Sequence, residues 1–194
     1  LLTEALSDEK IKGIIITSGK IDFSGGMDLS TLEALKRNSG SDPASKIFDY
    51  IMQAHGLLRK IELGRIDDTS KSKPVAFAGS GICAGIGTEI GLACHRRFLS
   101  SSKNSKIGLP EILVGLFPGL GGTTRVPRMM GLMGASSVLL EGKLFTSDKA
   151  KSIGLIDEVV SEDELIQKAK NWVLSASPQE LVKPWDQKGF KFPG

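Results

Sequence analysis

Two glutamates, Glu89 and Glu111, are the residues of this sequence best suited to acid–base chemistry. Glu89 follows the glycine pair Gly85 and Gly87, and Glu111 follows Pro110. A carboxylate can accept a proton and a carboxyl can deliver one, so two of them on separate elements can act as base and acid. A lone glutamate is more often a solvated surface charge, and the sequence leaves that alternative open.

The residues before Glu89 predict a buried strand that leads through a glycine-rich turn into a helix. Pro74 to Ala78 is short and apolar and is followed by Gly79, as in a strand buried on both faces. Gly85 to Cys94 can close into a helix with Glu89 about one turn inside. The first backbone N–H groups of a helix are unpaired and carry the positive end of its dipole, so this turn favours negative charge.

The segment around Glu111 predicts backbone that comes close to a ligand. Pro110 and Glu111 stand where a helix would start, and the proline and glycines of Pro118 to Gly122 then interrupt the chain. Glycine allows such close approach because it has no side chain. Glu111 would therefore lie beside a broken, donor-rich stretch.

A second set of free backbone donors is predicted near the start of the chain. Gly25 and Gly26 form a loop, and either Asp28 or Ser30 can cap the helix that follows. The simpler interpretation of this stretch is a turn with a good helix cap.

The whole chain predicts strands that alternate with helices, which is typical of an α/β protein whose sheet is at least partly parallel. The further predicted elements are a strand at Lys12–Thr17, a polar loop at Asn38–Pro43, helices at Ala44–Glu62, Leu132–Leu140, Ser147–Ser152 and Ser161–Leu174, and a strand within Gly154–Val160. Periodicity is lost after Pro178. We therefore predict a domain at residues 1–177 and a linker-like tail at 178–194.

Composition excludes several classes of function. The 194 residues are 40% hydrophobic and 24% charged, as expected of one globular domain with a sizeable core. No apolar run predicts a membrane span, and a net charge of +3 with 6% aromatic residues argues against a nucleic-acid partner. Cys83 and Cys94 lack metal-ligand spacing, so no metal site is predicted and a reduced intracellular setting fits.

A dinucleotide-binding turn is the main alternative from the glycines alone. Gly79, Gly81 and Gly85 follow a predicted strand, as in that motif. The motif also needs an acidic residue about 20 positions later, where this sequence has Leu99 followed by serines. We therefore disfavour it.

Four segments in order, FSGGMDL, KPVAFAGSGICAGIGTEIGLACHRRF, KIGLPEILVGLFPGLGGTTRVPRMMG and GLIDEVV, resemble the crotonase superfamily, and specifically enoyl-CoA hydratases. The resemblance extends from about Leu1 to Ala176. It implies an α/β fold built as a spiral of ββα units, the first of which would lie before Leu1.

The stretch ACHRR and the closing KPWDQKGFKFPG further resemble the hydratase part of a multifunctional fatty-acid β-oxidation enzyme. In such enzymes a 3-hydroxyacyl-CoA dehydrogenase part follows. We therefore expect this chain to be a fragment of a longer protein or to have lost its partner domain.

The resemblance implies hydration of trans-2-enoyl-CoA and assigns the roles. Glu111 would be the principal proton donor, and Glu89 would hold the water and help to deprotonate it. The backbone N–H of Gly119 would help to position the reacting groups. Met27 and Ile86 would supply the backbone N–H groups of an oxyanion hole for the thioester oxygen.

Gly26, Asp28 and Gly85 would contact the substrate, which brings its own coenzyme A, so no separate cofactor is expected. The family usually has three glycines where this chain has Gly85-Ile86-Gly87. The branched side chain of Ile86 could therefore crowd the thioester or shift the oxyanion hole.

Two other functions stay open. A Δ3,Δ2-enoyl-CoA isomerase generally needs only the glutamate at the Glu111 position, so the presence of Glu89 favours the hydratase. A crotonase-like scaffold could instead bind acyl-CoA without turnover. A homo-oligomer is compatible with the resemblance, as is a bacterial-like cytoplasmic setting, with mitochondria or peroxisomes left open.

Overall fold

The structure is a computed structural model that describes residues 1–37, 40 and 42–194, so part of the predicted loop at Asn38–Pro43 lies outside the described residues. Its elements follow in chain order. They are α1 (Leu2–Ser7), β1 (Ile14–Ile16), α2 (Leu29–Arg37), α3 (Pro43–Leu63), β2 (Val75–Gly79), β3 (Ile82–Ala84), α4 (Ile86–Ala93), β4 (Arg96–Ser100), β5 (Lys106–Gly108), η1 (Glu111–Val114), α5 (Gly122–Leu139), β6 (Leu144–Thr146), α6 (Ser147–Ser152), β7 (Glu158–Val160), α7 (Leu165–Ser175), η2 (Pro178–Leu181) and η3 (Pro184–Asp186), where η marks a 3₁₀ helix.

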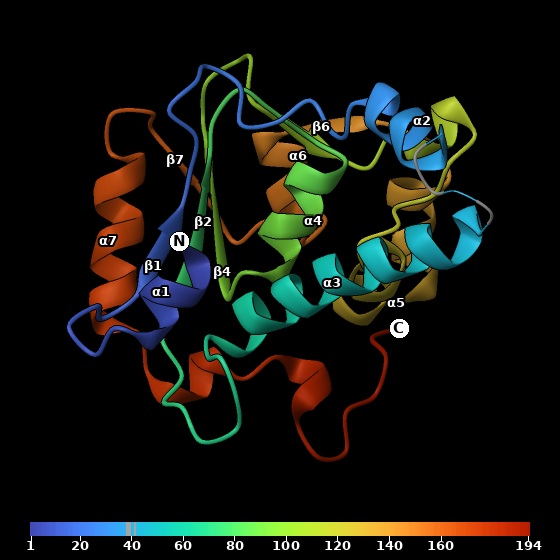
Figure 1. Ribbon diagram of the computed structural model, residues 1–194. Helices are drawn as coiled ribbons and strands as arrows, with labels where there is room; N and C mark the ends of the chain where they lie inside the picture. The colour runs from blue at the N-terminus through green and yellow to red at the C-terminus, as the bar shows by residue number, and fades with distance from the viewer. Residues whose placement is uncertain (38–39, 41) are drawn as a thin grey trace.

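A four-stranded parallel sheet with the order β1-β2-β4-β7 forms the centre of the molecule (Figure 1). Every residue of β2 is buried, which confirms the strand predicted at Pro74–Ala78. A parallel strand of this kind must be covered on both faces, and its continuous apolar sequence reflects that.

Helices cover the two faces of this sheet (Figure 1). On one face, Ala76 and Ala78 of β2 belong to a core cluster that includes residues of α7. On the other face, Val75 and Phe77 pack with Leu92 of α4. The alternation along β2 thus separates two cores, and α4 lies in the larger one.

A second sheet has the order β3-β5-β6, with β3 parallel to β5 and β5 antiparallel to β6. Strand β3 stands between β2 and α4, so the chain does not pass from β2 directly into a helix. A dinucleotide-binding turn needs that direct passage. The structure therefore also disfavours that alternative.

Helix α5 begins ten residues earlier than predicted, at Gly122 instead of Leu132. The predicted interruption at Pro118 to Gly122 therefore ends at Gly121, and the helix start predicted at Leu132 is wrong. Burial of Arg125, Val126 and Pro127 outweighs the low helix propensity of the glycines and the proline. A kink remains at Gly131, where φ is 75° and ψ is 170°.

Two other predicted helix starts differ in the structure. Glu111 begins one 3₁₀ turn, η1, instead of an α-helix. Helix α7 begins at Leu165 instead of Ser161, and the Ser161 hydroxyl donates a hydrogen bond to the carboxylate of Glu164 in the preceding turn. Side chains of serine and glutamate can stabilise such a turn as well as a helix.

The tail after Pro178 packs against the body of the protein. In Figure 1 it runs from the end of α7 past α3, and the chain ends near α5. Lys183 is buried, and the guanidinium of Arg59 in α3 donates two hydrogen bonds to the carboxylate of Asp186. The domain boundary at residue 178 stays a prediction.

Candidate active site

The two loops predicted to carry free backbone donors meet in the structure. Ser24 pairs with the chain around β3, since its N–H donates to the carbonyl of Ile82 and its carbonyl accepts from Ala84 at 2.8 Å. This pairing brings Gly26 against Gly85. A Cβ atom on Gly85 would lie only 3.3 Å from the Cα of Gly26.

Met27 and Ile86, the predicted oxyanion-hole residues, follow these two glycines. Ile86 is the first residue of α4, and neither its N–H nor that of Met27 donates a hydrogen bond within the described part of the chain. Gly85 has the left-handed φ of 56°, whereas no described residue other than glycine has a positive φ. Ile86 therefore occupies backbone that any residue can adopt.

Asp28, predicted to contact the substrate, caps helix α2. Its exposed carboxylate accepts a hydrogen bond from the N–H of Ser30 at 2.9 Å, and this bond lowers the pKa of Asp28. Ser30 itself lies inside the helix, so Asp28 is the cap of the two candidates. Its role toward a substrate stays a prediction.

Glu89 lies inside α4, where the sequence predicted it, and is only 2% exposed. Its Oε1 accepts hydrogen bonds from the N–H groups of Leu120 and Gly122, both at 2.8 Å. Burial raises the pKa of Glu89 against these two bonds and the charge of Arg125. The carboxyl group is thus fixed in place and protonates more readily than one in water.

Sequence reasoning missed the two donors to Glu89. It selected Gly119 from the same turn, but the N–H groups that bond the carboxylate belong to Leu120 and Gly122. The glycine-rich run was the available signal. A Cβ on Gly122 would approach Glu89 Oε1 to 3.2 Å, which explains why glycine fits there.

Glu111 is half-buried at the start of η1 and faces the same place. A Cβ on Gly85 would lie 3.1 Å from its Oε1, and its Oε2 is buried without a hydrogen-bond partner among the described residues. Burial, and then the charge of Glu89, raises the pKa of Glu111 against a hydrogen bond from its own backbone. An unpaired buried carboxyl oxygen is unusual and indicates that a molecule bound at this site supplies its hydrogen-bond partner.

The arrangement combines one fixed carboxyl, one carboxyl with a free oxygen, and unpaired backbone donors at the start of α4. Two carboxyl groups in different environments can serve as acid and base near neutral pH. Backbone donors that point at one spot can stabilise an oxygen that becomes negatively charged. The site is therefore suited to proton transfer next to a polarised carbonyl.

Exposed apolar side chains follow Glu111 in the chain. After Glu111, the chain exposes five large apolar residues on and after η1. They are Ile112, Leu113, Val114, Leu116 and Phe117. An exposed apolar patch of this kind is typical of a surface that binds an apolar ligand or another protein.

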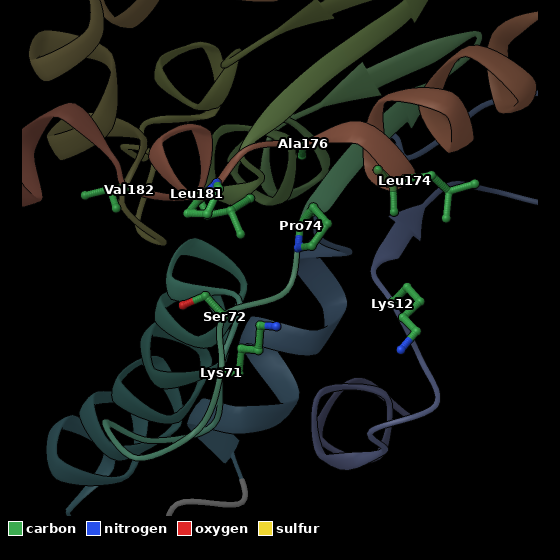
Figure 2. Close-up of a pocket in the computed structure, with 10 residues that line it drawn as sticks. Lys12, Lys71, Ser72, Pro74, Leu174, Ala176, Leu181 and Val182 are labelled. Atoms are coloured by element: carbon green, nitrogen blue, oxygen red, sulfur yellow. The ribbon is translucent and has the colours of Figure 1, made fainter.

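A separate surface cavity of about 510 Å³ lies elsewhere (Figure 2). Apolar residues at the end of α7 and in the tail, including Leu174 and Leu181, line it together with Lys12 and Lys71. Neither glutamate reaches it.

The described residues contain neither a candidate membrane-spanning helix nor a candidate metal-binding cluster. No described helix has the length and apolar character needed to cross a membrane. Within the same residues, no group of three or more histidine, cysteine, aspartate or glutamate side chains is placed to hold a metal ion.

Comparisons with known proteins agree on one family. The family model described as enoyl-CoA hydratase/isomerase matches residues 1–182. Among curated proteins, the chain is 34% identical over 184 residues to a glyoxysomal fatty acid beta-oxidation multifunctional protein of Cucumis sativus. It is 37% identical over 178 residues to the fatty acid oxidation complex subunit alpha of Shewanella loihica.

These matches cover 94% and 91% of this chain but 23% of the length of each relative. Among solved structures, an enoyl-CoA hydratase from Geobacillus kaustophilus superposes with a TM-score of 0.75 at 28% identity, covering 90% of this chain and 61% of the other. One from Bacillus anthracis gives 0.72 at 27% identity, covering 90% and 62%. The fold prediction is thereby confirmed.

Proposed function

The chain belongs to the enoyl-CoA hydratase/isomerase family, and from this we propose that it adds water across trans-2-enoyl-CoA to give 3-hydroxyacyl-CoA. One observation carries the choice of hydratase. Glu89 lies in the first turn of α4, and Glu111 lies against Gly85, the residue before that helix, where a Cβ atom on Gly85 would be 3.1 Å from Glu111 Oε1. An isomerization needs only one of these carboxyl groups, whereas hydration uses both.

In the proposed reaction, the thioester oxygen accepts hydrogen bonds from the N–H groups of Met27 and Ile86. Attack of water at C3 pushes negative charge onto this oxygen, and fixed donors stabilise that charge without reorganising. The free N–H groups at both positions support this assignment.

Proton transfer is divided between the two glutamates. Glu89 accepts a proton from the water as the C3–O bond forms, and Glu111 delivers a proton to C2. The raised pKa of Glu111 keeps a proton available, and its Oε2 has no hydrogen-bond partner among the described residues. Transfer of the proton from Glu89 back to Glu111 restores the starting state. The N–H of Gly119 would help to position the water.

Substrate contacts follow the same geometry. The backbones of Gly26 and Gly85 are in close contact, and together they would contact the thioester. Asp28 would contact the substrate at the edge of the site, at the end of α2 that it caps. The exposed apolar residues after Glu111 would line the path of the acyl chain.

We further propose that the reaction serves fatty-acid β-oxidation. The relatives are named as multifunctional or complex-forming proteins of that process, and one is bacterial while the other is glyoxysomal. A 3-hydroxyacyl-CoA dehydrogenase activity, in the parent chain or in a partner, would consume the product. Bacterial cytoplasm and a peroxisome-type organelle both suit such relatives.

The test is loss of the conjugated enoyl-thioester absorbance with short and medium trans-2-enoyl-CoA. We expect Glu111→Gln to lower kcat by about 100-fold or more, because a general acid contributes roughly 10² to 10⁴. Glu158→Gln is the matched control, since Glu158 is also partly buried but pairs with Arg96 and Lys168 away from the site.

Two results would contradict the proposal. If 3-enoyl-CoA is converted much faster than 2-enoyl-CoA is hydrated, the chain is an isomerase first. Tight acyl-CoA binding without turnover, unchanged by Glu111→Gln, would identify a binding scaffold.

A further inference from the structure

A buried ion pair lies directly behind the loop that holds Glu89. The Nε of Arg125 in α5 donates to Glu62 Oε1 of α3 at 3.0 Å, and the two side chains are 8% and 5% exposed. Burying two charges is costly unless their geometry and remaining hydrogen bonds are well satisfied. The ion pair therefore destabilises the folded protein unless further hydrogen bonds hold both side chains in place.

Arg125 also bonds the loop itself. Its Nη1 donates to the carbonyl oxygen of Leu120 at 2.9 Å, and the N–H of the same Leu120 donates to Glu89. The guanidinium lies against Gly121, where a Cβ would clash with Nη1 and φ is 102°. One side chain thus bonds the peptide that lies between the two peptides whose N–H groups bind the carboxylate of Glu89.

Glu62 also accepts hydrogen bonds from the tail and from a residue of its own helix. Trp185 Nε1 donates to Glu62 Oε1 at 3.1 Å, and Arg59 Nη1 donates to Oε2 at 2.7 Å. Arg59 also bonds both carboxylate oxygens of Asp186. Burial acts to raise the pKa of Glu62, but Arg125 and Arg59 outweigh it and lower that pKa, so Glu62 is ionised.

We propose that Arg125, oriented by Glu62, is a positioning residue for the hydration reaction: it fixes the Leu120 to Gly122 loop, and through that loop it fixes the carboxylate of Glu89. The proposal rests on the catalytic role given to Glu89 above. Neither Arg125 nor Glu62 touches the substrate in this arrangement. Their effect passes through two backbone N–H groups.

Charge adds a second effect that a purely structural role would lack. Burial raises the pKa of Glu89, and the positive charge of Arg125 lowers it. The acidic group that interacts with Glu89 is Glu111 on η1. Removing Arg125 should therefore raise the pKa of Glu89. The acidic limb of the kcat profile should move to higher pH.

The experiment compares Arg125→Lys, Arg125→Met and Glu62→Gln with Arg97→Lys. Arg97 is a matched control because it is a buried arginine paired with Asp157 at 2.7 Å, on β4. We expect both Arg125 variants to lower kcat by about 10- to 100-fold with little change in KM, as for a misplaced catalytic group. Only Arg125→Met should also shift the acidic limb, because lysine keeps the charge.

A titration of the Glu89 carboxyl by carbon-13 NMR, assigned with Glu89→Gln, provides a readout that needs no turnover. If the wild-type protein fails to hydrate enoyl-CoA, the proposed function fails, but a raised Glu89 pKa in Arg125→Met still supports the link from Arg125 to Glu89. If Arg125→Met does not fold, Arg125→Lys and Glu62→Gln decide through kcat. Unchanged kcat and unchanged Glu89 titration in the folded variants, as in Arg97→Lys, would overturn the proposal.

Discussion

Gly85 is the residue of the site whose backbone geometry is most demanding. Its φ of 56° and ψ of −125° turn the chain from β3 into α4, so that the N–H of Ile86 is free. The neighbouring Ile86, which departs from the family's three glycines, needs no such freedom. The departure therefore leaves the backbone donor intact.

We expect Gly85→Ala to lower kcat by about 100-fold, because its methyl group would press on Glu111 Oε1 and on Gly26. The strained φ and ψ of this position should add a loss of about 1 to 3 kcal/mol in the free energy of unfolding. Hydration kinetics and thermal denaturation measure the two effects. Ile86→Gly is the control and should keep most of the activity; a larger loss there would show that the isoleucine side chain matters more than the turn.

At the scale of elements, helix α4 carries the site at its N-terminus, and the tail contacts its C-terminus. The ammonium of Lys183 donates to the carbonyl oxygens of Leu92 and Cys94, where the last carbonyls of the helix lack partners. A cation at the C-terminus of a helix also suits the helix dipole. The tail thus completes the element that holds Glu89.

The buried position of Lys183 predicts that the free energy of unfolding depends on pH. Burial, and then Arg97, lowers the pKa of Lys183 to about 7, below its unfolded value of 10.5. Between these values the unfolded state binds more protons, so stability rises with pH. We expect wild-type stability to rise relative to Lys183→Met by about 1 kcal/mol per pH unit between pH 7 and 8.5. Denaturant unfolding at several pH values measures it, and a flat difference would contradict it.

Sequence patterns predicted the elements whose burial follows their own periodicity. The apolar run of β2 is of this kind because it is buried along its whole length, and the stripe along α3 packs against the core from Ile51 to Ile61. Gly122 to Met130 was missed, since Gly122 and Pro127 disfavour a helix locally. Tertiary burial of Arg125 and Val126 decides the outcome there, and a single sequence does not display it.

At the scale of the whole molecule, the placement of the two glutamates was predictable, but what holds them was not. Motif positions selected Glu89 and Glu111, and the structure brings both to the N-terminus of α4. The support of Glu89 depends on Arg125 meeting Glu62, which are far apart in the sequence. Such a contact has no local pattern.

The same scale decides whether residues 178–194 are a linker. We expect a chain ending at Val182 to unfold at a temperature several degrees lower, because it loses Lys183, Trp185 and Asp186 together. Differential scanning calorimetry measures the change. A chain ending at Gly189 keeps these contacts and is the control; equal melting temperatures for all three would support a linker.

The parallel sheet has a consequence for how the protein folds. Its pairs join distant parts of the chain, as Ile14 with Val75 and Phe98 with Glu158 show. Each pairing closes a long loop before any contact repays the lost entropy, so proteins of this topology fold slowly. During synthesis β4 must wait for β7, so one backbone edge of β4 stays unpaired until residues 158–160 have left the ribosome.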